Sequence, residues 1–147
     1  MNVSNFMTKN VISCKQDQTV ADAANLMIEK NLGGLPIVDN EGNLVGVITE
    51  SDFIGKKVDV PHALVSLTQL LGQTHYKGTV EEIFEKAKGS KLADVMTSDP
   101  HTIEQDADLS GASSLMLKNN VSRLPVVQDG KLVGIITKRD ILKSFAK

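Results

Sequence analysis

The sequence predicts an α+β (mixed α/β) fold in which one β-α-β-β-α unit occurs twice. Three observations lead to this prediction. The stretch LPIV at residues 35–38 returns as LPVV at 124–127, 89 residues later. Between residues 44–54 and 132–142, six of eleven positions are identical. Both copies also open with the pair Met-Thr, at residues 7–8 and 96–97. We therefore expect two repeats, residues 1–56 and 90–147, with an insert at residues 57–89.

Each repeat predicts the same order of elements. Short extended segments, VISC at 11–14 and HTI at 101–103, precede amphipathic helices whose apolar residues recur at helical spacing. These apolar residues are Val20, Ala23, Ala24, Met27 and Ile28 in the first repeat, and Leu109, Ala112, Leu115 and Met116 in the second. Two apolar strands joined by a Gly-containing turn then form a hairpin, and a helix closes the unit. One such unit cannot cover the apolar face of its sheet, so we expect the two repeats to pack sheet to sheet and cover each other.

The insert predicts two helices that neither repeat requires. The segment VPHALVSLTQLLG, residues 60–72, carries leucines along one side, with Pro61 near its start and Gly72 at its end. The segment TVEEIFEKAKG, residues 79–89, has Thr79 as a cap, Glu82 as its capping-box partner and Gly89 as a stop. Either these helices cover a sheet, or the leucine face packs on a second chain or over a cleft. The sequence leaves both interpretations open.

Composition and charge exclude several classes of function. The chain of 147 residues is 41% hydrophobic, and its net charge of −2 provides no long-range attraction for nucleic acid or an anionic membrane. No apolar stretch approaches the roughly 18 residues that a membrane span requires. The single cysteine, Cys14, is expected to be a small core residue in a reducing compartment. We therefore expect a cytoplasmic protein, with nucleic acid disfavoured as a partner.

The sequence carries none of the common catalytic signatures. It contains no G-x-S-x-G, no G-x-x-x-x-G-K-[ST], no G-x-G-x-x-G and no H-E-x-x-H. Its three histidines, His62, His75 and His101, are scattered and have no partners at metal-ligand spacing. We expect a protein that is not an enzyme, with no catalytic residues and no metal site.

One motif, G-x-x-T-x-x-D, follows the second hairpin strand in both repeats. Thr49 with Asp52, and Thr137 with Asp140, have the spacing of a capping box at the start of a helix. The same strand-to-helix junction also directs backbone N–H groups toward an anion. A structural cap and a ligand site are compatible here, and the spacing alone does not separate them.

These motifs give the chain a resemblance to a known family. The Met-Thr pairs, LPIVDNEGNLVGVITESD in the first repeat and SRLPVVQDGKLVGIITKRD in the second resemble a tandem pair of cystathionine-beta-synthase (CBS) domains, often called a Bateman module. The resemblance implies a pseudo-twofold arrangement of the repeats with two clefts between them, each able to bind an adenosine-type ligand, and a regulatory role. It further implies a homodimer that forms a disc of four repeats.

The resemblance also implies which residues bind the ligand. Asp52 and Asp140 would accept hydrogen bonds from ribose hydroxyls, and Thr49 and Thr137 would bind the phosphate or ribose side. The residues of the second cleft, which we expect to be preferred, are Thr97, Pro100, His101, Val121, Ser122, Arg123, Thr137, Lys138, Arg139 and Asp140. Those of the first, weaker cleft are Val11, Ile12, Leu32, Gly33, Gly34, Thr49, Ser51 and Asp52.

The two clefts differ in charge. The second repeat has Lys138 and Arg139 inside the motif and Arg123 before LPVV, whereas the first has Glu50 and Ser51 inside the motif. Phosphate should therefore favour the second cleft. We expect AMP, ADP or ATP as the regulatory ligand, with S-adenosylmethionine as a further candidate, and a separate effector protein. The alternative is a ligand-free oligomerisation module that recruits a protein partner through its insert.

Overall fold

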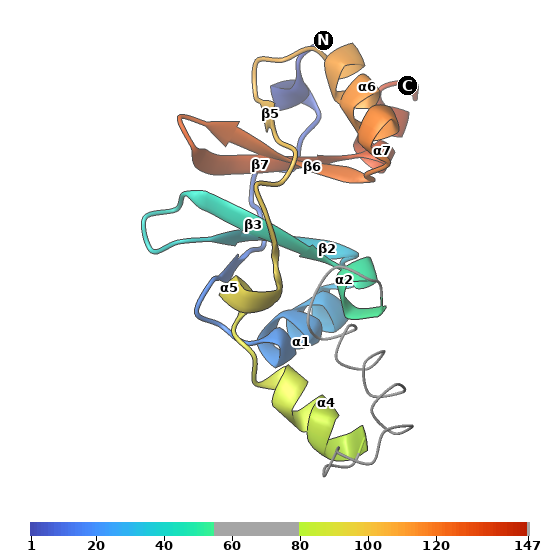
Figure 1. The fold of residues 1–147 in the computed structure, drawn as a ribbon. Helices are drawn as coiled ribbons and strands as arrows, with labels where there is room; N and C mark the ends of the chain where they lie inside the picture. The colour runs from blue at the N-terminus through green and yellow to red at the C-terminus, as the bar shows by residue number, and fades with distance from the viewer. Residues whose placement is uncertain (55–79, 147) are drawn as a thin grey trace. The chain divides into compact units, whose positions relative to one another are not determined.

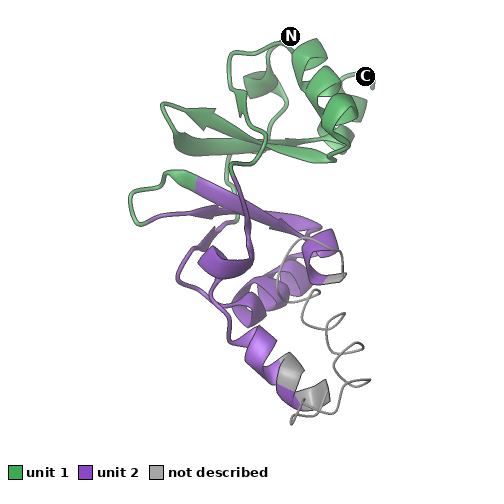
Figure 2. Cartoon of the chain, in the orientation of Figure 1, with its two compact units in different colours: residues 1–12, 40–44, 99–147 green, residues 13–39, 45–98 purple. Residues whose placement is uncertain are grey.

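The computed structural model describes residues 1–54 and 80–146, and it divides the chain into two compact units (Figure 2). Unit 1 contains residues 1–12, 40–44 and 99–147, and unit 2 contains residues 13–39 and 45–98. The predicted α+β class with two repeats is confirmed. The units, however, do not coincide with the sequence repeats, because residues 1–12 lie with the second repeat and residues 90–98 lie with the first.

Unit 1 is a three-stranded sheet with two α-helices and one short 3-10 helix. Its elements are the 3-10 helix η1 (Val3–Asn5), β5 (Ile103–Glu104), α6 (Leu109–Asn119), β6 (Arg123–Gln128), β7 (Lys131–Thr137) and α7 (Lys138–Lys143) (Figure 1). The strand order is β5-β6-β7, with β5 parallel and β7 antiparallel to β6. The register shifts between Val126 and Val127, which marks a β-bulge. The predicted hairpin of the second repeat is thus confirmed.

The core of unit 1 forms where the apolar face of α6 meets this sheet. It consists of Val3, Ile103, Leu109, Ala112, Met116, Leu124, Val126 and Ile136. Three of these, Leu109, Ala112 and Met116, are among the four residues that recur at helical spacing, and the fourth, Leu115, packs against this core. The pattern therefore correctly predicted both the helix and the side that it buries.

Unit 2 has the same core plan with additional elements. These are β1 (Cys14–Lys15), α1 (Val20–Lys30), β2 (Gly34–Val38), β3 (Leu44–Thr49), α2 (Glu50–Ile54), α4 (Val80–Lys88), α5 (Leu92–Val95) and β4 (Thr97–Ser98). The strand order is β1-β2-β3-β4, with β1 parallel to β2 and β4 antiparallel to β3. Its core contains Cys14, Val20, Ala23, Met27, Leu35, Ile37, Ile48, Ala87, Leu92 and Val95. The short helix α5 and the fourth strand were not predicted from the sequence.

Each Met-Thr pair lies on the sheet of the other repeat. Thr8 forms an antiparallel bridge with Ile135 of β7, with N–H···O distances of 2.9 and 3.0 Å in the two directions. In unit 2, Thr97 of β4 pairs with Val47 of β3. The sulfur of the preceding methionine fills the space beside a glycine: a Cβ at Gly134 would lie 2.5 Å from the Sδ atom of Met7. Each repeat therefore supplies an edge segment to the other repeat's sheet.

The two longest described helices, α1 and α6, end in the same way. Asn31 after α1 and Asn120 after α6 adopt the left-handed conformation, with φ of 54° and 53°. The next N–H group returns to the helix, from Leu32 to the carbonyl of Met27 at 2.8 Å and from Val121 to the carbonyl of Met116 at 3.0 Å. These bonds satisfy carbonyl groups at the helix end and fix the direction in which the chain leaves it.

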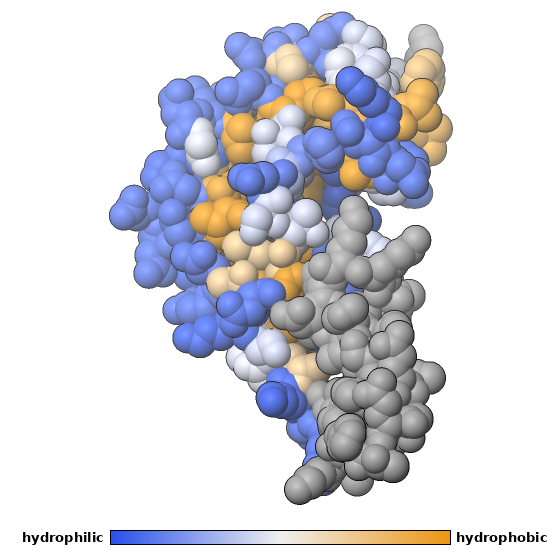
Figure 3. Space-filling model, viewed as in Figure 1, coloured by the Kyte–Doolittle hydropathy of each residue, from blue (hydrophilic) through white to orange (hydrophobic). Residues whose placement is uncertain are grey.

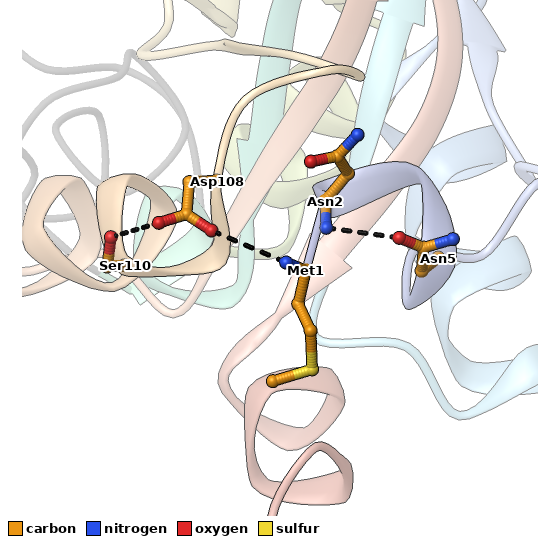
Figure 4. A network of polar contacts seen from close by, with 5 residues as sticks. All are labelled: Met1, Asn2, Asn5, Asp108 and Ser110. Atoms are coloured by element: carbon orange, nitrogen blue, oxygen red, sulfur yellow. Dashed lines mark hydrogen bonds and ion pairs between the residues drawn. The ribbon is translucent and has the colours of Figure 1, made fainter.

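The N-terminal segment is joined to the start of α6 by polar contacts (Figure 4). Asn2 forms a bridge with Asp108, and the N–H of Leu109 donates to the carbonyl of Met1 at 3.1 Å. The hydroxyl of Ser110 donates to Oδ2 of Asp108 at 2.6 Å, and the terminal ammonium lies 3.8 Å from its Oδ1. The hydrogen bond from Ser110 is the main reason why the pKa of Asp108 is lowered from its ordinary value.

The last part of the insert, residues 80–89, falls within the described residues. Helix α4 begins at Val80 and ends at Lys88, before Gly89, as the segment TVEEIFEKAKG predicted. The predicted cap Thr79 and the leucine-bearing helix at residues 61–72 lie outside the described residues. Of the helices in residues 1–54 and 80–146, none has the length and apolar character to cross a bilayer.

Candidate functional site

The centre of the candidate site in unit 1 is the turn between β7 and α7. Thr137 ends the strand with extended backbone, at φ −120° and ψ 168°, and caps the helix. The N–H of Thr137 donates to Oδ2 of Asp140 at 2.9 Å, and the N–H of Asp140 donates to the hydroxyl of Thr137 at 3.1 Å. These reciprocal bonds confirm the predicted capping box. They hold a carboxylate that is 5% exposed at the end of the strand.

The second oxygen of Asp140 has a different environment. Its Oδ1 lies 3.8 Å from the Nζ atom of Lys143, one turn further along α7. This distance exceeds that of a hydrogen bond, so Oδ1 keeps the capacity to accept a hydrogen bond from a hydroxyl. Lys143 was not among the residues predicted from the sequence. Its position three residues after Asp140 on a helix was the signal that could have identified it.

The corresponding turn in unit 2 has the same main contact. The N–H of Thr49 donates to Oδ2 of Asp52 at 2.9 Å, and Asp52 is also 5% exposed. The hydroxyl of Thr49 lies 2.9 Å from the hydroxyl of Ser51. Both repeats therefore place a buried carboxylate directly after the second hairpin strand, as the shared motif predicted.

A second symmetric contact joins each turn to the loop that follows the long helix. The N–H of Lys138 donates to the carbonyl of Ser122, and the N–H of Glu50 donates to the carbonyl of Gly33, both at 3.0 Å. The loop segments expected to bind adenine thus lie beside the carboxylate turns of their own units. The same bonds engage backbone N–H groups that the sequence had left free for an anion. The N–H groups of Lys138 and Glu50 are therefore not available to an anion.

Three cationic residues lie next to the turn of unit 1 in sequence or in strand register. Arg123 is the first residue of β6 and pairs with Thr137 across the two strands, so its backbone lies beside the turn. Arg139 is exposed and lies between Thr137 and Asp140 in sequence. Lys138 is also exposed, and it lines a groove of about 240 Å³ between α6 and α7 together with Ser113, Met116, Leu117 and Ile141. Two cations therefore lie in the same short helix as Asp140, and a third begins the strand that pairs with β7.

The structure distributes the remaining predicted residues over both units. Pro100 is half-buried and His101 exposed in unit 1, whereas Thr97 belongs to β4 of unit 2. Val11 and Ile12, predicted for the first cleft, lie in unit 1. The rest of that set, Leu32, Gly33, Gly34, Thr49, Ser51 and Asp52, lies in unit 2. The second set is thus held almost entirely within one unit, and we call its members Val121, Ser122, Arg123, Thr137, Lys138, Arg139 and Asp140 the Asp140 site.

The described residues contain no cluster of side chains that could bind a metal ion. Within residues 1–54 and 80–146, no three side chains of His, Cys, Asp or Glu converge as metal ligands would. The buried thiol of Cys14 belongs to the core of unit 2. Burial raises its pKa, and the negative charge of Asp22 adds to that increase. A thiol held protonated in this way is a poor nucleophile.

Comparison with known proteins identifies the family. The model of the CBS domain matches residues 3–59 and 92–147, which together make up most of the chain. The chain therefore belongs to the CBS domain family and contains a pair of CBS domains. The residues between the two matches overlap the insert predicted at residues 57–89 without sharing its bounds.

Several relatives cover nearly the whole chain. Uncharacterized protein MJ1426 of Methanocaldococcus jannaschii is 32% identical over 99% of the chain and 91% of its own length. Inosine-5'-monophosphate dehydrogenase of the same organism is 39% identical over 92% of the chain. The chain spans only 22% of that enzyme. The similarity thus concerns a minor part of the dehydrogenase, and the reaction of that enzyme is not assigned to this chain.

Two solved structures of similar proteins contain adenosine compounds. The chain is 30% identical to CBSX2 in complex with AMP, with a TM-score of 0.72 and coverage of 97% of this chain and 94% of that one. It is 28% identical to the CBS domain pair of protein MJ0100 in complex with 5'-methylthioadenosine and S-adenosyl-L-methionine. The TM-score there is 0.70, with 99% and 95% of the two chains covered.

Proposed function

We propose that this CBS pair is a regulatory module that binds an adenosine-containing ligand at the Asp140 site. AMP, ADP and ATP are the preferred ligands, and S-adenosylmethionine is a further candidate. The observation that carries the proposal is the buried carboxylate of Asp140, which keeps one oxygen available while the other accepts the Thr137 N–H. The complexes of similar CBS pairs with AMP and with S-adenosyl-L-methionine support the same ligand class.

The chemistry of the site suits a ribose. A carboxylate oxygen accepts hydrogen bonds from the two neighbouring hydroxyls of a sugar diol. Because Asp140 is 5% exposed, water competes little for such bonds. The neighbouring loop at Val121 and Ser122 is joined to the turn by the Lys138 N–H, and its backbone would face the base. A nucleoside thus finds in one unit both a sugar acceptor and a surface for adenine.

The charge of the Asp140 site favours a phosphorylated ligand. Arg123, Lys138 and Arg139 supply positive charge there. In the corresponding turn of unit 2, Glu50 replaces Lys138 and Ser51 replaces Arg139. We propose that the site around Asp52 binds an uncharged nucleoside, binds more weakly or stays unused. We further propose that ligand binding is relayed to a separate effector protein through a change in conformation or association.

A thermal-shift panel tests the proposed function. A ligand at about 100 times its Kd stabilises the folded protein by about 2.7 kcal/mol, so AMP, ADP or ATP at millimolar concentration should raise the Tm by several degrees. The Asp140→Asn variant, which retains a similar shape, should lose most of that increase. CMP serves as the nucleotide control. Equal Tm values with and without every adenosine compound would refute the proposal.

Self-association is a second candidate function, and an exposed apolar surface favours it. Leu117 of α6 is 83% exposed, and Leu142 of α7 and Phe145 are 64% and 83% exposed. Figure 3 shows hydrophobic atoms at the surface of this part of unit 1. Such a face is stabilised when a second copy covers it. Sedimentation of a Leu117→Lys, Leu142→Lys double variant should show fewer dimers than the unchanged protein, and identical distributions would argue against this interface.

A further inference from the structure

The Asp140 site has a neighbouring cation that the shared motif does not include. The ammonium of Lys143 lies 3.8 Å from Oδ1 of Asp140. The carboxylate side chain is 7% exposed, whereas the lysine side chain is 65% exposed. One partner of this ion pair is thus fixed in the protein, and the other is a long side chain that extends into solvent.

The two oxygens of Asp140 have separate roles. Oδ2 accepts the N–H of Thr137 at 2.9 Å and maintains the cap. Oδ1 is therefore the oxygen that a ribose hydroxyl would approach. At 3.8 Å the Lys143 ammonium is too distant for a hydrogen bond to Oδ1, and a ribose hydroxyl bound to Oδ1 would lie close to it. The ammonium would accordingly lie next to any ligand that uses this carboxylate.

The cation is present in only one repeat. With the 88-residue offset that aligns the two G-x-x-T-x-x-D motifs, the residue that corresponds to Lys143 is Gly55. The carboxylate itself is common to both repeats, as Asp52 and Asp140. A role in holding the carboxylate would therefore be expected in both repeats, whereas a role in recognising ligand charge is needed in one only.

We propose that Lys143 is a specificity-determining residue, whose ammonium makes the Asp140 site prefer adenosine ligands that carry phosphate over uncharged ones. This inference rests on the proposed function. A 5'-phosphate is only a few bonds away from the ribose diol, so it lies well within the Debye length of about 10 Å from this ammonium at 0.1 M salt. Attraction between exposed charges at such a distance changes affinity by about three- to fivefold.

Calorimetric titrations of AMP and of adenosine test the inference. We expect Lys143→Gln to weaken AMP binding about three- to fivefold and to leave adenosine binding within twofold. Lys143→Arg, which retains the charge, should keep the AMP-to-adenosine ratio of the unchanged protein. Lys118→Gln in the last turn of α6 is the matched control, because this exposed lysine has the same charge and is not a member of the Asp140 site. Raising the salt concentration to 0.5 M should reduce the effect of Lys143→Gln.

The outcomes distinguish failure of this inference from failure of the proposed ligand-binding function. If AMP and adenosine both bind but Lys143→Gln leaves their ratio unchanged, the inference is wrong and the proposed function stands. An equal loss of both ligands also overturns it, since that result assigns Lys143 to holding the carboxylate. If neither ligand binds the unchanged protein, the proposed function fails and the inference fails with it.

Discussion

The thioether of Met7 occupies the space beside Gly134 in which a side chain would lie. A Cβ at Gly134 would be 2.5 Å from the sulfur of Met7 and 3.0 Å from the carbonyl oxygen of Thr8. The same relationship exists between Met96 and Gly46 in unit 2, again with a sulfur at 2.5 Å. The glycine of the G-x-x-T-x-x-D motif is therefore required by the Met-Thr pair of the other repeat.

Alanine at Gly134 is expected to destabilise the protein by about 1–3 kcal/mol, because a methyl group there overlaps both a side chain and the backbone. Gly46→Ala should have a similar effect. Gly111→Ala is the control, because this helical glycine has open space around its Cβ position. The Gly111→Ala protein should be more stable than the unchanged protein by about 0.5–1 kcal/mol. Urea unfolding measures all three changes, and a stable Gly134→Ala protein would contradict the proposed packing.

The capping box of α7 leads to a second prediction. Thr137→Ala removes the acceptor for the Asp140 N–H and should reduce the free energy of unfolding by about 1 kcal/mol. Thr137→Ser retains the hydroxyl and should preserve most of the stability. If alanine and serine variants unfold at the same urea concentration, the hydroxyl does not contribute to the cap.

The carboxyl group of Asp108 provides a pH prediction. Its pKa is lowered in the folded protein, chiefly by the hydrogen bond from Ser110, so its contribution to stability is present above the unfolded pKa of about 3.9. That contribution is lost as the pH falls through the lower, folded pKa. Ser110→Ala should raise the pKa of Asp108 toward its ordinary value. An NMR titration of the carboxyl carbon measures the shift, and an unchanged pKa would exclude Ser110 as the main cause.

The thiol of Cys14 should react slowly in the folded protein. It is 1% exposed, and burial raises its pKa, so little thiolate forms near pH 8. Its contribution to stability is fully present below the unfolded pKa of about 8.5 and is lost as the pH rises through the higher, folded pKa. Iodoacetamide labelling should therefore proceed mainly through unfolded molecules and accelerate with urea. Rapid labelling in native buffer would contradict this account.

Local patterns in the sequence determined much of what the structure shows. Helical spacing identified the buried side of α6 through Leu109, Ala112 and Met116. The spacing of Thr137 and Asp140 identified a capping box that the structure confirms. These features depend on contacts between residues close in the chain, which a sequence pattern expresses directly.

Contacts between distant segments were not predictable in the same way. The Met-Thr pairs were recognised as repeats, but nothing in their own sequence indicates that Thr8 pairs with Ile135. A strand of one or two residues carries no periodicity from which a partner can be inferred. Lys143 was missed because the motif ends at Asp140, although helix geometry brings the two charges together.

The most direct test of the central claim is an NMR titration of 15N-labelled protein with AMP. We expect the largest shifts at the amides of Ser122, Arg123 and Thr137 through Asp140, with loss of these shifts in Asp140→Asn. The assignment of the ligand to Asp140 would be contradicted if the chemical shifts changed mainly at other residues. It would also be contradicted if the changes persisted in Asp140→Asn.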